Sequence, residues 1–351
     1  MVRTVGRGVW SALCGLRLEH FTFVMATGIV STAVANSGAD DLARVLFWIG
    51  LVGYGVLAVG TVLGLVRRQW SVRAELHDGA CSALAFVAAG GVLSAHATST
   101  GSTTLALVLI VVSGVAWFVL QHGVLASLVV RASTGDGPRS LSMFDGTWFL
   151  LVVSTQALAV SLGAWSKIVH TDVGATLAVL AWGLGVLQLI VIACLVSARL
   201  LVVGVGRDDD VSPYWVFLGS GAITILGAAE VLGAAYDQIL LSPELIGGVA
   251  MAIWAFVTWM LLPTVALQVW QELRSGSRGR YRAALWSAVF PIGMYGESSR
   301  QLGFIRGTSW LDTLGTWEAW VALGAWIAVA LGLVSAIGGL VAGGAPRWRR
   351  S

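Results

Sequence analysis

Ten long apolar segments constrain this chain more than any other feature of its sequence. A helix needs about 20 mostly apolar residues to cross the hydrocarbon core of a bilayer. Segments of this kind, separated by short connections, cover residues 19–36, 44–66, 79–98, 104–130, 144–165, 173–203, 213–236, 244–270, 282–305 and 314–343. The sequence therefore predicts an all-α integral membrane protein with ten transmembrane helices.

The composition excludes a soluble protein of the same length. Hydrophobic residues make up 57% of the 351 residues and charged residues only 11%, whereas a soluble domain carries about 25% charged residues. So much apolar surface has to face lipid, because a soluble fold cannot cover it. The net charge of +3, with no basic patch, gives no support for a nucleic-acid partner. We expect the lipid bilayer as the surroundings of this chain.

The basic residues predict how the helices are oriented. Lys and Arg in short loops stay on the cytoplasmic side of a membrane. With ten spans, 17 of the 21 basic residues fall on one side, and the other side holds Arg44, Lys167, Arg300 and Arg306. We expect a multi-pass protein of the cell membrane with both termini in the cytoplasm. The expected parts are a cytoplasmic N-terminal segment (1–18), a transmembrane transporter or channel domain (19–343) and a basic cytoplasmic tail (344–351).

The odd-numbered segments resemble one another, which indicates an internal repeat. Four of them begin with an aromatic residue and place a small or hydroxyl residue seven positions later. The pairs are Phe21 and Gly28, Trp148 and Thr155, Trp215 and Ala222, and Trp286 and Gly293, whereas the third segment shows the pattern poorly. Helical hairpins repeated in parallel around an axis are one way to build a central pathway. Chance similarity among glycine-rich apolar helices is the alternative interpretation.

Three stretches of the odd-numbered segments carry a more specific pattern. They are FTFVMATGIVS (21–31), PYWVFLGSGAITILGA (213–228) and LWSAVFPIGMYGESSRQLG (285–303). In these stretches, in its ten spans and in their orientation, the chain resembles the tellurite-resistance/C4-dicarboxylate transporter family. That family includes bacterial tellurite-resistance proteins, yeast malate and sulfite permeases and the slow anion channel of plant guard cells.

The resemblance implies five helical hairpins in a quasi-fivefold ring around a central pore, with the odd-numbered helices lining the pore. It also implies a homotrimer in which each subunit has its own pore. A phenylalanine on the ninth helix is the family's pore gate, and its position matches Phe290 here. Members pass small anions or organic acid anions, such as chloride, nitrate, sulfite and malate. Neither a cofactor nor a metal is expected.

Phe290 lies in a region where a gate is physically reasonable. It comes roughly 12 Å into the ninth segment, and Pro291 removes a backbone N–H there, so we expect a kink. A bulky ring at a constriction blocks ions by dewetting, whereas an ordinary core aromatic is the alternative. The residues expected to shape or line the same pathway are Pro291, Gly293, Gly28, Thr27, Thr155, Gly219 and Gly221.

Charged and polar residues inside the spans are further candidates, because charge in lipid is expensive. Glu230, Glu297 and Arg300 lie late in the seventh and ninth segments, and the last two are neighbours on one helix face. Arg300 could attract anions, and Glu297, which departs from the family motif, could carry a coupled proton. A hydrated ion pair is the alternative. Gln156 could contact the passing anion, although such groups more often make interhelical hydrogen bonds.

Three functions are compatible with the sequence. The first is an anion channel or uniporter with a phenylalanine gate, and the second is a proton-coupled carrier of C4-dicarboxylates. The third, an intramembrane enzyme, is remote, since the sequence has neither an HExxH nor a GxSxG motif. We expect passage of small anions and no enzymatic activity.

Overall fold

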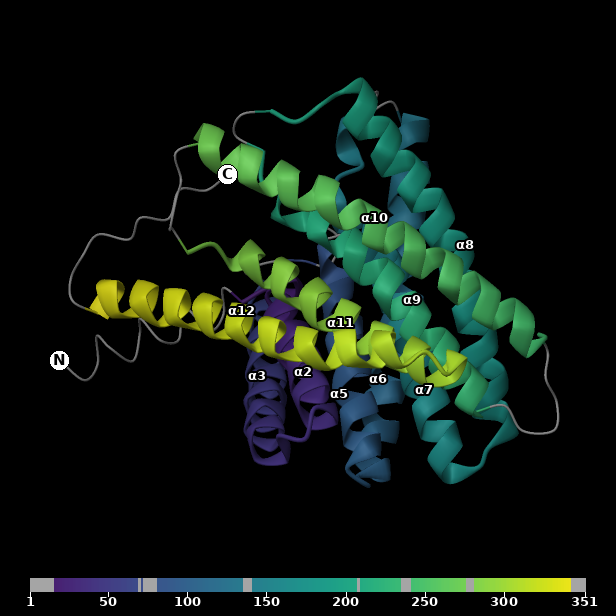
Figure 1. Ribbon diagram of the computed structural model, residues 1–351. Helices are drawn as coiled ribbons and strands as arrows, with labels where there is room; N and C mark the ends of the chain where they lie inside the picture. Colours follow the sequence, from purple (N-terminus) through teal and green to yellow (C-terminus); the bar gives the residue numbers. More distant parts are fainter. Residues whose placement is uncertain are drawn as a thin grey trace.

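The residues that the structure describes form a bundle that contains ten long helices (Figure 1). This computed structural model describes residues 16–68, 71, 81–134, 141–206, 209–234, 241–275 and 281–341. The long helices are α2 (Thr22–Asn36), α3 (Asp40–Val66), α5 (Ala85–Ser99), α6 (Thr103–Thr134), α7 (Phe149–Val169), α8 (Asp172–Val202), α9 (Trp215–Ala234), α10 (Pro243–Ser275), α11 (Trp286–Arg306) and α12 (Ser309–Val341). No strand occurs in these ranges, and the all-α membrane fold is confirmed.

Part of the pattern behind the predicted orientation lies outside the described residues. Seven of the 17 basic residues on the expected cytoplasmic side fall within the described ranges. The others are Arg3, Arg7, Arg73, Arg139, Arg207, Arg278, Arg280, Arg347, Arg349 and Arg350. The expected basic tail and most of the expected N-terminal segment therefore receive no structural description.

One of the ten predicted spans differs in character from the other nine. Over the described residues, nine helices are long and apolar enough to cross a membrane. The remaining one, α11, has 21 residues but carries Glu297, Arg300 and Arg306 in its second half. Fourteen of its residues are buried. Other helices rather than lipid surround α11, and this is why it tolerates charge that a lipid-facing helix would not.

Each odd-numbered span begins with a 3-10 turn, so the internal repeat is present in the backbone. The turns are η1 (Leu18–Phe21) before α2, η2 (Ser82–Leu84) before α5, η4 (Gly146–Trp148) before α7, η5 (Ser212–Tyr214) before α9 and η6 (Ala283–Leu285) before α11. A further turn, η3 (Leu141–Met143), precedes η4. The repeat includes the third span, where the sequence pattern is poor.

The helices that begin with these turns contact one another in a closed order. Helix α2 contacts α5, α5 contacts α7, α7 contacts α9, α9 contacts α11, and α11 returns to α2. We call these the inner helices, and α3, α6, α8, α10 and α12 the outer helices. In an apolar stretch of 18 residues from each span, between 61% and 83% of the residues are buried for α2, α5, α7 and α9. For the outer helices the corresponding share is 11% to 28%. The quasi-fivefold ring around a central pore stays a prediction.

Close approach of two inner helices depends on a glycine. A Cβ atom at Gly91 of α5 would lie 2.8 Å from the Cβ atom and 2.9 Å from the carbonyl oxygen of Ala157 in α7. The carbonyl oxygen belongs to the backbone of α7, so a side chain at position 91 would push the two helices apart. Small residues at such contacts are typical of membrane helices.

We expect Gly91→Ala to lower the free energy of unfolding by about 1–3 kcal/mol, the usual cost of overpacking. Thermal unfolding of the purified protein measures this. The matched control is Gly114→Ala on α6, where a Cβ atom would meet nothing within 4 Å. Equal melting temperatures for the two variants would contradict this packing.

Candidate functional site

Phe290, the predicted gate, lies in the contact between two inner helices. Its side chain on α11 is fully buried. A Cβ atom at Gly219 of α9 would lie 2.8 Å from Phe290 Cε1 and 3.1 Å from Pro291 Cγ. The structure thus brings Phe290, Pro291 and Gly219 together, and the aromatic ring rests on a helix surface without a side chain. The gating role of Phe290 and the kink at Pro291 stay predictions.

The other predicted small residues lie at different contacts. Gly28 of α2 faces Val92 of α5, and Gly293 of α11 faces Ile29 of α2, so both lie between inner helices. Gly221 of α9 instead faces the outer helix α10, because a Cβ atom there would meet the Val257 side chain. Gly28, Gly219 and Gly293 therefore determine how closely inner helices approach one another, whereas Gly221 determines the approach of an outer helix.

Four tryptophans of the outer helices bind inner helices, and sequence analysis did not predict this. Each indole N–H donates a hydrogen bond of 2.9 Å to an oxygen on the inner helix that comes next in the closed order. The bonds run from Trp117 of α6 to Thr155 Oγ1 of α7, from Trp182 of α8 to the Thr224 carbonyl of α9, from Trp254 of α10 to Ser299 Oγ of α11, and from Trp326 of α12 to Thr27 Oγ1 of α2. The sequence feature that could have indicated these bonds is the position of the four tryptophans in mid-span, away from the membrane–water interfaces where tryptophan is usually enriched.

The polar residues predicted on the pathway take part in the same contacts. Thr27 and Thr155 accept the tryptophan hydrogen bonds, and Gln156 Nε2 donates to the Trp182 carbonyl of α8 at 3.2 Å. These are the interhelical hydrogen bonds that were the alternative interpretation. Their hydroxyl and amide groups help to hold the wall of the bundle together, and a contact with a passing anion stays a prediction.

The predicted pair of Glu297 and Arg300 forms, and two further residues join it. Arg300 Nη2 lies 2.9 Å from Glu297 Oε1, and Arg300 Nε lies 3.2 Å from Oε2. Gln301 of the same helix and Asn36, the last residue of α2, also donate to Oε1. We call these four side chains the Glu297 cluster. Asn36 was missed because spacing along one helix does not show which residue of another helix lies opposite.

Glu230 lies at a different place, between α9 and α7. A Cβ atom at Gly163 of α7 would be 2.9 Å from Glu230 Cβ. Lys167 Nζ of α7 is close to the same helix, because a Cβ atom at Gly233 of α9 would lie 3.2 Å from it. Among the described residues, no group of three or more His, Cys, Asp or Glu side chains is placed to hold a metal ion.

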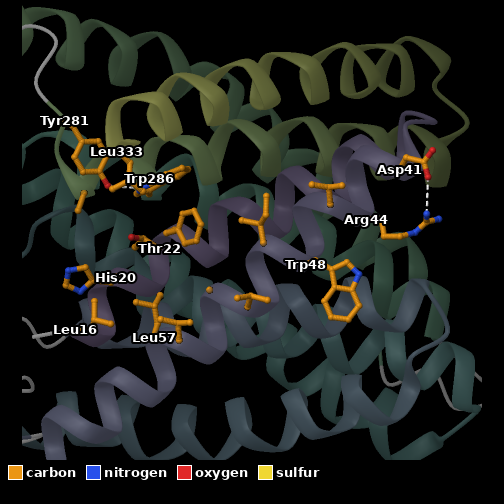
Figure 2. Close-up of a pocket in the computed structure, with 17 residues that line it drawn as sticks. Leu16, His20, Thr22, Asp41, Arg44, Trp48, Leu57, Tyr281, Trp286 and Leu333 are labelled. Carbon is orange, nitrogen blue, oxygen red and sulfur yellow. Dashed lines mark hydrogen bonds and ion pairs between the residues drawn. The ribbon is translucent and has the colours of Figure 1, made fainter. Parts of the chain in front are cut away.

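A groove with a volume of about 1070 Å³ runs along the outside of α2 and α3 (Figure 2). Its lining includes Val52 of α3, which is exposed, Leu333 of α12, and Tyr281 at the end where α11 begins. Asp41 and Arg44 form an ion pair of 3.0 Å at the opposite end. This groove is mostly apolar and lies outside the contacts between inner helices, so it suits lipid rather than a small anion.

Comparison with known proteins points to membrane transport. A family model described as voltage-dependent anion channel matches residues 16–334. Uncharacterized membrane proteins from two strains of Mycobacterium tuberculosis are 36% identical over 138 residues, which is 39% of this chain and 70% of each relative. The sulfite efflux pump SSU1 of Trichophyton rubrum is 24% identical over 199 residues, which is 54% of this chain and 53% of the pump. The chain is thus similar to an anion channel family, to membrane proteins and to a sulfite efflux pump.

The bond between Trp326 and Thr27 gives a test of how the outer helices are held. We expect Trp326→Phe and Thr27→Val each to lower the free energy of unfolding by about 1 kcal/mol, as for other hydrogen bonds in membranes. The double variant should lose less than the sum, because both substitutions remove the same bond. Thermal unfolding measures all three variants.

The control for this cycle is Trp310→Phe, since Trp310 of α12 is 57% exposed. It should change stability little and should add to Thr27→Val without coupling. Strict additivity of Trp326→Phe and Thr27→Val would argue against the bond.

Proposed function

Because the chain belongs to the voltage-dependent anion channel family, we propose that it lets small anions cross the bilayer along the axis enclosed by its inner helices. This is the family that the motif resemblance indicated under the name of tellurite-resistance/C4-dicarboxylate transporters. The observation that carries the proposal is the closed order of contacts among α2, α5, α7, α9 and α11. An ion path through lipid needs protein on every side, and a closed order of inner helices supplies that.

We propose Phe290 as the gate of this path. The ring belongs to an inner helix, is fully buried and packs against Gly219 of the neighbouring inner helix. A large apolar ring at a narrow point excludes water, and an ion without water meets a high barrier. The absence of a side chain at position 219 lets the ring lie directly against the backbone of α9.

The charges on the inner helices support a path with distinct halves. The Asp, Glu, Lys and Arg residues within α2, α5, α7, α9 and α11 are Lys167, Glu230, Glu297, Arg300 and Arg306. All of them follow the midpoint of their helix, on the side that the basic loops predict to be outside the cell. The half that contains Phe290 is uncharged, as a dewetting gate requires, and the outer half resembles a hydrated entrance.

The remaining features of the proposal follow from the sequence and the family. We propose that both termini lie in the cytoplasm, that the protein resides in the cell membrane with residues 19–343 as its transport domain, and that it assembles as a homotrimer with one path in each subunit. Its transported ions would be chloride, nitrate, sulfite or a malate-like dicarboxylate. Sulfite is included because the fungal relatives are sulfite efflux pumps.

The proposal is tested by flux in liposomes that contain the purified protein. Chloride, nitrate, sulfite and malate are assayed separately, with a pH difference imposed in either direction. We expect flux of at least one anion that follows its own gradient and needs no pH difference. Uptake driven by the pH difference alone would assign a proton-coupled carrier instead, and no flux of any of the four would overturn the proposal.

We expect Phe290→Ala to raise anion flux at least about tenfold, since removing a barrier of about 1.4 kcal/mol is worth that factor. The same liposome assay measures it, after the amount of folded protein has been matched. Phe304→Ala is the control, because Phe304 lies on the same helix but is 81% exposed. Equal flux in the two variants would refute the gate.

A further inference from the structure

The carboxylate of Glu297 is held by an unusually complete set of donors. Its Oε1 accepts hydrogen bonds from Arg300 Nη2 at 2.9 Å, Gln301 Nε2 at 2.9 Å and Asn36 Nδ2 at 3.0 Å. Its Oε2 accepts from Arg300 Nε at 3.2 Å. Three side chains from two inner helices thus converge on one carboxylate, whereas a pair that only neutralised charge would need Arg300 alone.

The location of the Glu297 cluster relates it to the proposed path. Glu297 follows Phe290 by seven residues, which is about 10 Å along the helix. Seven residues are about 20° short of two full turns, so the two side chains leave α11 from nearly the same face. The cluster also bridges α11 to the end of α2, its neighbour in the closed order. It therefore lies outward of the gate, on the face of α11 that carries the gate.

The burial differs between the two charged members of the cluster. The side chain of Glu297 is 2% exposed, while that of Arg300 is 20% exposed. The Arg300 side chain is thus partly exposed, while the Glu297 carboxylate is enclosed by the protein. Two further carboxylates of α12 lie nearby. The side chain of Glu318 packs on Gly296, and the charge of Asp312 acts on Arg300. Arg300 is the cation that offsets this acidic surrounding.

The chemistry of the donors matches a planar anion with two or more oxygens. The Nε and Nη2 atoms of arginine bind the two oxygens of a carboxylate side by side, and the amides of Asn36 and Gln301 add neutral N–H donors. We propose that Asn36, Arg300 and Gln301 form an anion-binding site at the outer entrance, which Glu297 occupies as an internal ligand. A free carboxylate or nitrate-like oxyanion takes this site when the Glu297 side chain leaves it.

This inference rests on the proposed function in one respect, because it takes the anion that enters the site to be the anion that is transported. A tethered carboxylate competes at a high effective concentration, so a free anion binds weakly while Glu297 is in place. Removing the Glu297 carboxylate should expose the donors and leave Arg300 partly buried without its partner, which destabilises the protein. A small carboxylate from solution should then restore the stability by binding the folded state.

The test is the rescue of Glu297→Ala by acetate. Thermal unfolding of the purified variant is followed in increasing sodium acetate, with acetamide at the same concentrations as the uncharged comparison. We expect a melting temperature below that of the wild type, rising by several degrees with acetate and unaffected by acetamide. The wild type and the matched control Glu318→Ala, which removes a neighbouring carboxylate on α12, should show only a small response to the salt.

One further variant and a second way of preparing Glu297→Ala keep the outcome decisive. Glu297→Ala with Arg300→Ala lacks both charges of the pair and should lose the response to acetate. If Glu297→Ala is not recovered as folded protein, it is prepared with acetate or acetamide present throughout. Recovery with acetate alone supports the site. Recovery with neither, or a melting temperature that rises no more than in Glu318→Ala, overturns the inference.

Flux separates this inference from the proposed function. In liposomes, Glu297→Ala should lower the half-saturating concentration of an external oxyanion such as nitrate by roughly tenfold, as expected when a tethered competitor is removed. Rescue by acetate without any anion flux in the wild type would keep the site and reject the function. Flux in the wild type without rescue would keep the function and reject the site.

Discussion

Hydrogen bonds from tryptophan side chains in mid-span join the outer helices of this bundle to its inner helices. Lipid provides no hydrophobic force between helices, so close packing and interhelical hydrogen bonds have to provide the association. Each of the four bonds links an outer helix to the inner helix that comes next in the closed order, and the last one returns from α12 to α2. The fifth outer helix, α3, makes an aromatic contact in place of this bond, since Tyr54 stacks on Phe86 of α5.

These contacts determine which side chains remain available to line a path along the axis. Thr27 and Thr155 accept hydrogen bonds from tryptophans, and Gln156 donates one to the backbone of α8. These polar groups in mid-span therefore join helices to one another. The glycines then set the distances between helices, and Gly219 leaves Phe290 packed against bare backbone. Charge is confined to the second half of the inner helices. A path of this kind would combine an apolar, closed half with an outer half that attracts or holds anions.

The sequence predicts single helices better than the contacts between them. Long apolar segments predicted each of the ten helices, although α11 is less apolar than the other nine and its charges are tolerated because other helices cover it. The spacing of three residues predicted the pair of Glu297 and Arg300, because one helix fixes both positions. The same reasoning could not find Asn36, which comes from another helix, nor the acceptors of the tryptophans. Sequence reasoning assigned both Gly219 and Gly221 to the pathway, although Gly219 faces the inner helix α11 and Gly221 faces the outer helix α10.

The central claim, that Phe290 lies on an anion path, is tested most directly by chemical modification. A variant with Phe290→Cys, made after the cysteines at 14, 81 and 194 are replaced, is reconstituted in liposomes and treated with a small, negatively charged thiol reagent. We expect the thiol to react and anion flux to fall as the added charge and bulk close the path. A thiol that stays unreacted in protein that conducts anions, or that reacts without any change in flux, would contradict the claim.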